Sequence, residues 1–183
     1  MIVMAHTEVA SEEPAGRYLK KALRIAQQST AIMHRFHHYE NEILSQDGAE
    51  SIEKGNGRIL FVDIEEAGAE VAKQILEHLG YQTKAGSDPE KALAEFRSNP
   101  ENFDLVITDM TLPKMSGETL ASEILKIRLD IPIILCTAGY RQPQVDIKLG
   151  STGIAALLIK PLTVSDIAQT VRNVLDQSNQ QPI

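Results

Sequence analysis

The sequence is poor in cysteine and in long apolar runs, and it carries no excess of positive charge. Its single cysteine, Cys136, excludes an internal disulfide and lies in an apolar run, where cysteine usually acts as a small buried hydrophobe. The formal net charge of -7 disfavours contact with nucleic acid or with anionic membranes, because both present negative surfaces. We therefore expect neither of them as a partner.

The lack of a long apolar run also indicates where in the cell the protein is expected. No run approaches the roughly 20 residues that a membrane span requires. Residues 1–5 are apolar, but they are too few for the core of a signal peptide and lack its basic flank. Hydrophobic residues make up 43% of the chain and charged residues 23%, which is typical of a soluble globular protein, so we expect a cytoplasmic location.

Residues 46–57 are polar and glycine-rich, and we interpret them as a linker between two parts of the chain. Residues 1–45 favour one long amphipathic helix, because no proline follows Pro14 and no glycine follows Gly16 in this part. A seam of residues recurs at alternating steps of four and three and is apolar except at Ser29. Its members are Tyr18, Ala22, Ile25, Ser29, Ile32, Phe36, Tyr39 and Ile43. Such a stripe has to be buried, so we expect a homodimer formed through this helix.

The stretch 58–177 alternates apolar runs, typical of buried strands, with helix patterns, and residues 178–183 form a polar tail. Asp88-Pro89, Ser116, and Thr163 with Asp166 mark the starts of helices. The expected strands are 59–62, 81–84, 105–108, 131–136 and 154–159, and a further helix is expected within 141–149. Strands that are continuous apolar runs predict a doubly wound α/β domain, in which five helices flank a five-stranded parallel sheet. The long N-terminal helix precedes this domain in the sequence.

Four polar residues stand where apolar runs end: Asp63, Asp109, Thr137 and Lys160. The carboxyl ends of parallel strands meet at one edge of the sheet, so we expect these side chains to converge there. A lone aspartate after a strand is more often a turn or cap residue, but two carboxylates with a hydroxyl and an ammonium favour a site. Two carboxylates suit Mg²⁺, and one of them could act as a nucleophile toward a phosphoryl group whose oxygens the lysine contacts.

The segments that carry these residues resemble the four motifs of response-regulator receiver domains of two-component signalling, in the family's order and spacing. The segments are 58–66, 103–117, 135–138 and 159–162. The resemblance implies a flavodoxin-like sheet with strand order 2-1-3-4-5. It also implies that Asp109 accepts the phosphoryl group, that Thr137 is the switch hydroxyl and that Lys160 contacts the phosphate.

The same resemblance implies a magnesium site and a set of partners. The metal would be held by Asp63, Asp109 and the backbone carbonyl of Thr111, and Pro161 would follow a cis peptide bond. A histidine kinase or a phosphotransfer protein would donate the phosphoryl group. No output domain follows the last predicted helix, so we expect the signal to pass to a downstream protein target.

Two positions depart from the family pattern. Receivers usually carry two adjacent acids after the first strand, and here the second is Ile64, so we expect weakened Mg²⁺ binding and slow phosphorylation. Glu65 is a further candidate ligand, although its backbone position is shifted. Leu157 stands where the family often has an aromatic switch residue. Both changes favour the alternative of a degenerate pseudo-receiver, an interaction module that works without phosphorylation.

Residues 18–36 resemble the second helix of the dimerisation hairpin of histidine kinases, so the N-terminal helix would be a remnant kept for dimerisation. His34, His37 and His38 lie there, but a pair one turn apart is a poor metal site without a third ligand, and we interpret them as surface or interface residues. A phosphatase of the aspartyl-phosphate type would need a second catalytic acid and usually a cap domain. The loop after Asp109 is too short to supply them, so we expect no enzymatic activity.

Overall fold

The computed structural model describes residues 54–138 and 153–179 of the chain. The predicted N-terminal helix, most of the predicted linker, the helix expected within 141–149 and the last four residues lie outside the described residues. The described part contains all five predicted strands and four of the five helices that were expected to flank the sheet.

The centre of the domain is a five-stranded sheet whose strands are all parallel. The order β2-β1-β3-β4-β5 confirms the expected strand order. Since the first, third and fourth strands are neighbours, the residues at their carboxyl ends are brought side by side. The strands are β1 Arg58–Val62, β2 Gln82–Gly86, β3 Leu105–Asp109, β4 Ile133–Ala138 and β5 Ile154–Lys160.

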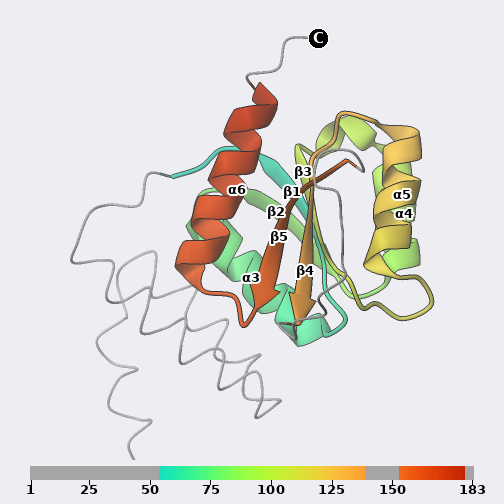
Figure 1. Cartoon of the computed structure of the whole chain (residues 1–183), viewed down its shortest axis with the longest axis horizontal. Coiled ribbons are helices and arrows are strands. Elements are labelled where there is room, and N and C mark those ends of the chain that lie inside the picture. The colour runs from blue at the N-terminus through green and yellow to red at the C-terminus, as the bar shows by residue number, and fades with distance from the viewer. Residues whose placement is uncertain (1–53, 139–152, 180–183) are drawn as a thin grey trace, which may run out of the picture.

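Helices cover both faces of the sheet (Figure 1). The core is accordingly divided in two: one set of buried residues joins α3 and α6 to the sheet, and a second set joins α4 and α5 to its other face. The helices are α3 Glu66–His78, α4 Pro89–Ser98, α5 Gly117–Ile127 and α6 Val164–Asn179, with a short 3₁₀ turn at Pro100–Asn102. None of the described helices is long and apolar enough to cross a membrane.

The predicted helix starts are confirmed by their capping bonds. The carboxylate of Asp88 accepts hydrogen bonds from the backbone N–H groups of the first turn of α4. The hydroxyl of Ser116 accepts one from the N–H of Thr119 in α5. At α6, Thr163 and Asp166 cap each other reciprocally, at 3.0 and 3.3 Å. Each of these three helices therefore begins at a fixed residue in the connection that follows a strand.

Strands β1, β3 and β5 are each one residue longer than expected, and larger differences occur at β2, β4 and α6. Strand β2 begins at Gln82 and continues to Gly86, and α6 continues to Asn179. Strand β4 is shifted to Ile133–Ala138, because Pro132 has no N–H to donate and the polar end still pairs with β5. The shift leaves Thr137 inside β4 rather than after it.

Candidate functional site

Asp63 and Asp109 lie at the carboxyl ends of the neighbouring strands β1 and β3, as their positions in the sequence predict. Both are nearly buried, with 4% and 6% of their surface exposed. Carboxylates are rarely so buried unless they are paired or hydrogen-bonded, because the charged form loses its hydration.

Lys160, the last residue of β5, supplies the opposite charge. Its Nζ donates a hydrogen bond of 2.7 Å to Oδ2 of Asp63 and one of 2.7 Å to Oδ2 of Asp109. These residues are 97 and 51 positions away from Lys160 in the sequence. The peptide bond that follows, Lys160-Pro161, is cis, as the resemblance implied.

The second oxygen of each carboxylate meets a backbone N–H group. The N–H of Glu65 donates to Oδ1 of Asp63 at 3.0 Å, and the N–H of Thr111 donates to Oδ1 of Asp109 at 3.4 Å. The two aspartates are therefore held in the same way, each between the shared lysine and the backbone two residues later. This leaves both carboxylates oriented toward the same ammonium group.

The charges at the site shift the proton affinity of the lysine. Burial lowers the pKa of Lys160, but the hydrogen bonds and charges of Asp109 and Asp63 together outweigh burial, so its pKa lies above the ordinary value. Lys160 is consequently cationic at neutral pH. Beneath the site, burial is also the main reason why the pKa of Cys136 is raised to about 12, so this thiol is a packed neutral group.

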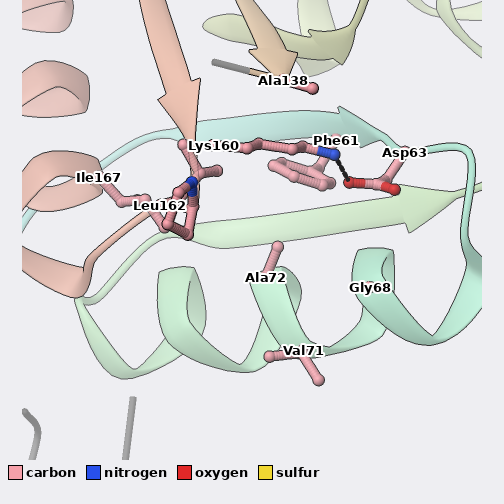
Figure 2. A pocket seen from close by; sticks show the side chains of 10 residues that line it. Phe61, Asp63, Gly68, Val71, Ala72, Ala138, Lys160, Leu162 and Ile167 are labelled. Carbon is pink, nitrogen blue, oxygen red and sulfur yellow. Dashed lines mark hydrogen bonds and ion pairs between the residues drawn. The ribbon is translucent and has the colours of Figure 1, made fainter. Parts of the chain in front are cut away.

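An apolar cavity of about 260 Å³ adjoins the charged cluster. Figure 2 shows Lys160 extending past the ring of Phe61 to Asp63, while Ala72 of α3 and Leu162 and Ile167 near the start of α6 form the apolar walls. Apolar walls lower the local dielectric response, which strengthens the attraction between the lysine and the carboxylates.

Comparison with known proteins agrees with this geometry. The profile of the response regulator receiver domain matches residues 59–172. The chain belongs to the response regulator receiver family. The two-component response regulator ARR12 of Arabidopsis thaliana is 29% identical over 118 residues, which are 64% of this chain and 20% of that protein. The regulatory protein PhoP of Bacillus subtilis is 31% identical over 124 residues, or 67% of this chain and 50% of PhoP. The chain thus spans a half or less of these relatives.

Solved receiver structures have the same fold. A receiver domain protein from Clostridium thermocellum superposes with a TM-score of 0.62 at 29% identity, covering 67% of this chain and 96% of that one. The response regulator TrrA from Thermotoga maritima, in complex with Mg²⁺ and BeF, has a TM-score of 0.56 at 34% identity, covering 64% of this chain and 97% of TrrA. The described sheet is therefore a receiver sheet.

Thr137 and Thr111 lie at the same edge of this receiver. Thr137 is in β4 next to Cys136, the residue in register with Asp109. Among the residues that the structure describes, its hydroxyl donates only a long 3.5 Å hydrogen bond, to the carbonyl of Ala138. Thr111 is exposed, and its backbone runs past the Asp109 carboxylate. Their roles as switch hydroxyl and metal ligand stay predictions.

The residues present fit Mg²⁺ with a reduced set of donors. Asp63 and Asp109 bring two carboxylates to one point, and Mg²⁺ is commonly held by one or two carboxylates while it keeps several waters. Ile64, 46% exposed, adds no donor, and Glu65 is exposed beside it. Within residues 54–138 and 153–179, no group of three or more His, Cys, Asp or Glu side chains is placed to hold a metal ion.

Gly117 has a structural role in the site that the sequence motif alone did not reveal. It begins α5, and its N–H donates to the carbonyl of Met110 at 2.9 Å. A Cβ atom at this position would lie 2.1 Å from the carbonyl oxygen of Asp109, so only glycine lets α5 approach the end of β3 this closely. The spacing from Asp109 to Gly117 within the receiver motif is the signal that could have indicated it.

We expect Gly117→Ala to lower the free energy of unfolding by about 2 kcal/mol, because the added methyl group overlaps backbone atoms that have to move. Urea denaturation measures the change. Gly86→Ala is the matched control, since a Cβ atom there would have nothing within 4 Å. Equal stabilities of the two variants would contradict the close approach at Asp109.

Lys114, in the loop after Asp109, was not anticipated as part of the site region. Its Nζ lies 2.8 Å from Oε2 of Glu90 and 3.7 Å from Oδ2 of Asp88, and its φ of 66° is unusual for a residue other than glycine. The pKa of Lys114 is raised by the hydrogen bond to Glu90 and by the charge of Asp88. The loop after Asp109 is thereby linked to the start of α4.

Proposed function

We propose that this receiver accepts a phosphoryl group on Asp109 from a histidine kinase or a phosphotransfer protein, and that it signals to a downstream protein through a surface that changes with phosphorylation. The observation that carries the proposal is the shared ammonium group: Lys160 Nζ lies 2.7 Å from both buried carboxylates. A carboxylate at a strand end beside a fixed cation is suited to taking up an anionic group.

In the proposed reaction, an oxygen of Asp109 attacks the phosphorus of a phosphohistidine. The new P–O bond forms as the P–N bond breaks, and the departing imidazole retains the bonding electron pair and takes up a proton from water. Lys160, which contacts Asp109 Oδ2, would exchange this partner for a phosphoryl oxygen. Mg²⁺, when bound by Asp63 and Asp109, would offset charge on the phosphoryl oxygens.

The roles of the remaining residues follow from their positions. Within the described residues, the Thr137 hydroxyl makes only the long bond to Ala138, which supports a role in donating a hydrogen bond to the phosphoryl group. Residues 110–116 form a short loop between β3 and α5 with no space for a cap domain, which supports a signalling role rather than a phosphatase activity. We propose that the protein is not an enzyme and acts through protein partners.

The proposal predicts a covalent adduct that depends on a single carboxylate. Incubation with acetyl phosphate and Mg²⁺ should add one phosphoryl group to the wild type by intact mass, and beryllofluoride should shift the NMR signals of residues near Lys160. Asp109→Asn, which keeps the shape but loses the nucleophile, should abolish both effects. If the wild type gives neither the adduct nor the shifts at millimolar Mg²⁺, the proposed function is wrong.

A second candidate function is a pseudo-receiver that works as an interaction module without phosphorylation. The observation in its favour is Ile64, whose side chain is exposed beside Asp63 where a third carboxylate would help to hold Mg²⁺. Leu157 adds to it: this residue is half-buried and packs against the core on the α4 and α5 side, and it has no polar tip to report on the state of the site. This candidate function requires that the binding of Mg²⁺ is weakened.

A further inference from the structure

The last residues of the predicted linker lie against the receiver. The N–H of Gly55 donates a hydrogen bond of 2.8 Å to the carbonyl of Leu79, and the carbonyl of Gly57 accepts one of 2.9 Å from the N–H of Gln82. The second bond extends the backbone pairing of β1 with β2 to Gly57, the residue before β1 begins. Backbone hydrogen bonds of this kind give a strand-like segment a defined direction.

Glycine is required in this contact by space and by backbone conformation. A Cβ atom on Gly55 would lie 2.1 Å from Cζ of the Tyr81 ring, and one on Gly80 would lie 2.6 Å from the carbonyl oxygen of Gly55. Gly57 has a φ of 152°, and a Cβ atom there would lie 3.2 Å from Leu175 in α6. The glycines that suggested a free tether in the sequence therefore allow a close backbone approach.

The segment meets the receiver at the edge of the sheet opposite to Asp109. It contacts α3 through the carbonyl of Leu79 and α6 through Leu175, close to the C-terminal ends of both helices. In Figure 1 the stretch that leads into β1 passes beside α6. Helix α3 begins just after Asp63 and α6 begins just after Lys160, so both helices span the domain from the charged cluster to this segment.

We propose that residues 54–57 form a fixed junction, and that the surface made by Tyr81, Gln82 and Leu175 is a docking surface for this part of the chain itself. The junction sets the direction in which the chain leaves the receiver at Lys54, so residues 54–57 do not act as a free tether. The proposal does not depend on phosphorylation.

Trypsin cleavage after Lys54 tests the junction in the full chain. A protease needs several residues around the bond in an extended, undocked state, and residues 55–57 are held by two hydrogen bonds. We expect the fragment that begins at residue 55 to form at least about tenfold more slowly than from a synthetic peptide covering residues 50–61. Gly55→Ala should raise the rate toward that of its own peptide, and Gly86→Ala, the open-space control, should not.

Hydrogen exchange at the N–H of Gln82 gives a second readout. Gly55→Ala should speed this exchange about tenfold or more, while the N–H of Asp104, which donates to the carbonyl of Arg58, should keep its rate. Tyr81→Leu removes the ring atoms that the new methyl group meets, so combining it with Gly55→Ala should restore protection. Wild-type cleavage as fast as that of the peptide, or equal Gln82 exchange in the Gly55→Ala and Gly86→Ala variants, would overturn the proposal.

Discussion

Replacing Lys160 with methionine is expected to lower the free energy of unfolding at neutral pH by about 3 kcal/mol. Methionine keeps the unbranched apolar stem of the side chain and removes the ammonium group, so the carboxylates of Asp63 and Asp109 would face each other without a cation. Removing one partner of a buried ion pair is costly because the remaining charge cannot be hydrated. Lys160 keeps 18% of its side chain exposed, which places the expected effect at the lower end of the range for buried pairs.

The pH dependence of this effect follows from the direction of the pKa shift. The pKa of Lys160 in the folded protein lies above its ordinary value of 10.5 because the carboxylates favour the ammonium form despite burial. The stabilisation is therefore complete below the unfolded pKa and is lost as the pH rises through the folded pKa. The difference in stability between wild type and Lys160→Met should stay constant from pH 7 to about 10 and shrink above that.

Urea denaturation at a series of pH values measures both effects. Lys126→Met is the matched control, because Lys126 pairs with Glu123 on the surface and its side chain is 67% exposed. Exposed pairs contribute little, so this variant should resemble the wild type. A Lys160→Met variant as stable as Lys126→Met would show that the bridge contributes nothing to the fold.

Ile64→Asp is expected to increase Mg²⁺ affinity by about a hundredfold, which corresponds to about 2.7 kcal/mol. The substitution adds a third carboxylate next to Asp63, and ligand charge is a main determinant of affinity for hard cations. Ile64 is 46% exposed and so contributes little to the core. Loss of its packing should therefore not mask the gain.

Titration with Mg²⁺ followed by NMR or calorimetry measures the affinity of each variant. Ile64→Asn is the control, since it has nearly the same shape as aspartate without the charge, and it should bind Mg²⁺ no more than about tenfold better than the wild type. An unchanged affinity in Ile64→Asp would mean that the missing acid does not limit metal binding. The pseudo-receiver candidate would then lose its main support.

The sequence was informative about the site because of a property of parallel sheets. Asp63, Asp109 and Lys160 each follow an apolar run, and parallel strands bring their carboxyl ends to one edge, so their convergence was predictable. The bridge itself was not, since it depends on how far the lysine side chain extends and in which rotamer. Thr137 was placed at the correct edge, but the hydrogen bonds of its hydroxyl could not be derived from its position.

Other features escaped sequence analysis for different physical reasons. In a sequence, glycines such as Gly55 and Gly57 suggest a flexible segment. Glycine, however, allows both a free and a closely packed backbone. The hydrogen bonds of Gly55 and Gly57 and the position of the Tyr81 ring distinguish the two cases here. The start of β4 was misplaced because Ile131 is as apolar as the strand that follows, and hydrophobicity alone cannot locate the first ladder hydrogen bond.

The directions of the helices give the domain an electrical asymmetry. Helices α3, α5 and α6 follow β1, β3 and β5 in the chain, so their N-terminal ends lie toward the edge that holds Asp63, Asp109 and Lys160. The aligned peptide dipoles of each helix place partial positive charge at its N-terminal end. The backbone itself therefore favours negative charge at this edge, a contribution that does not depend on any side chain and that persists whatever residue occupies position 64.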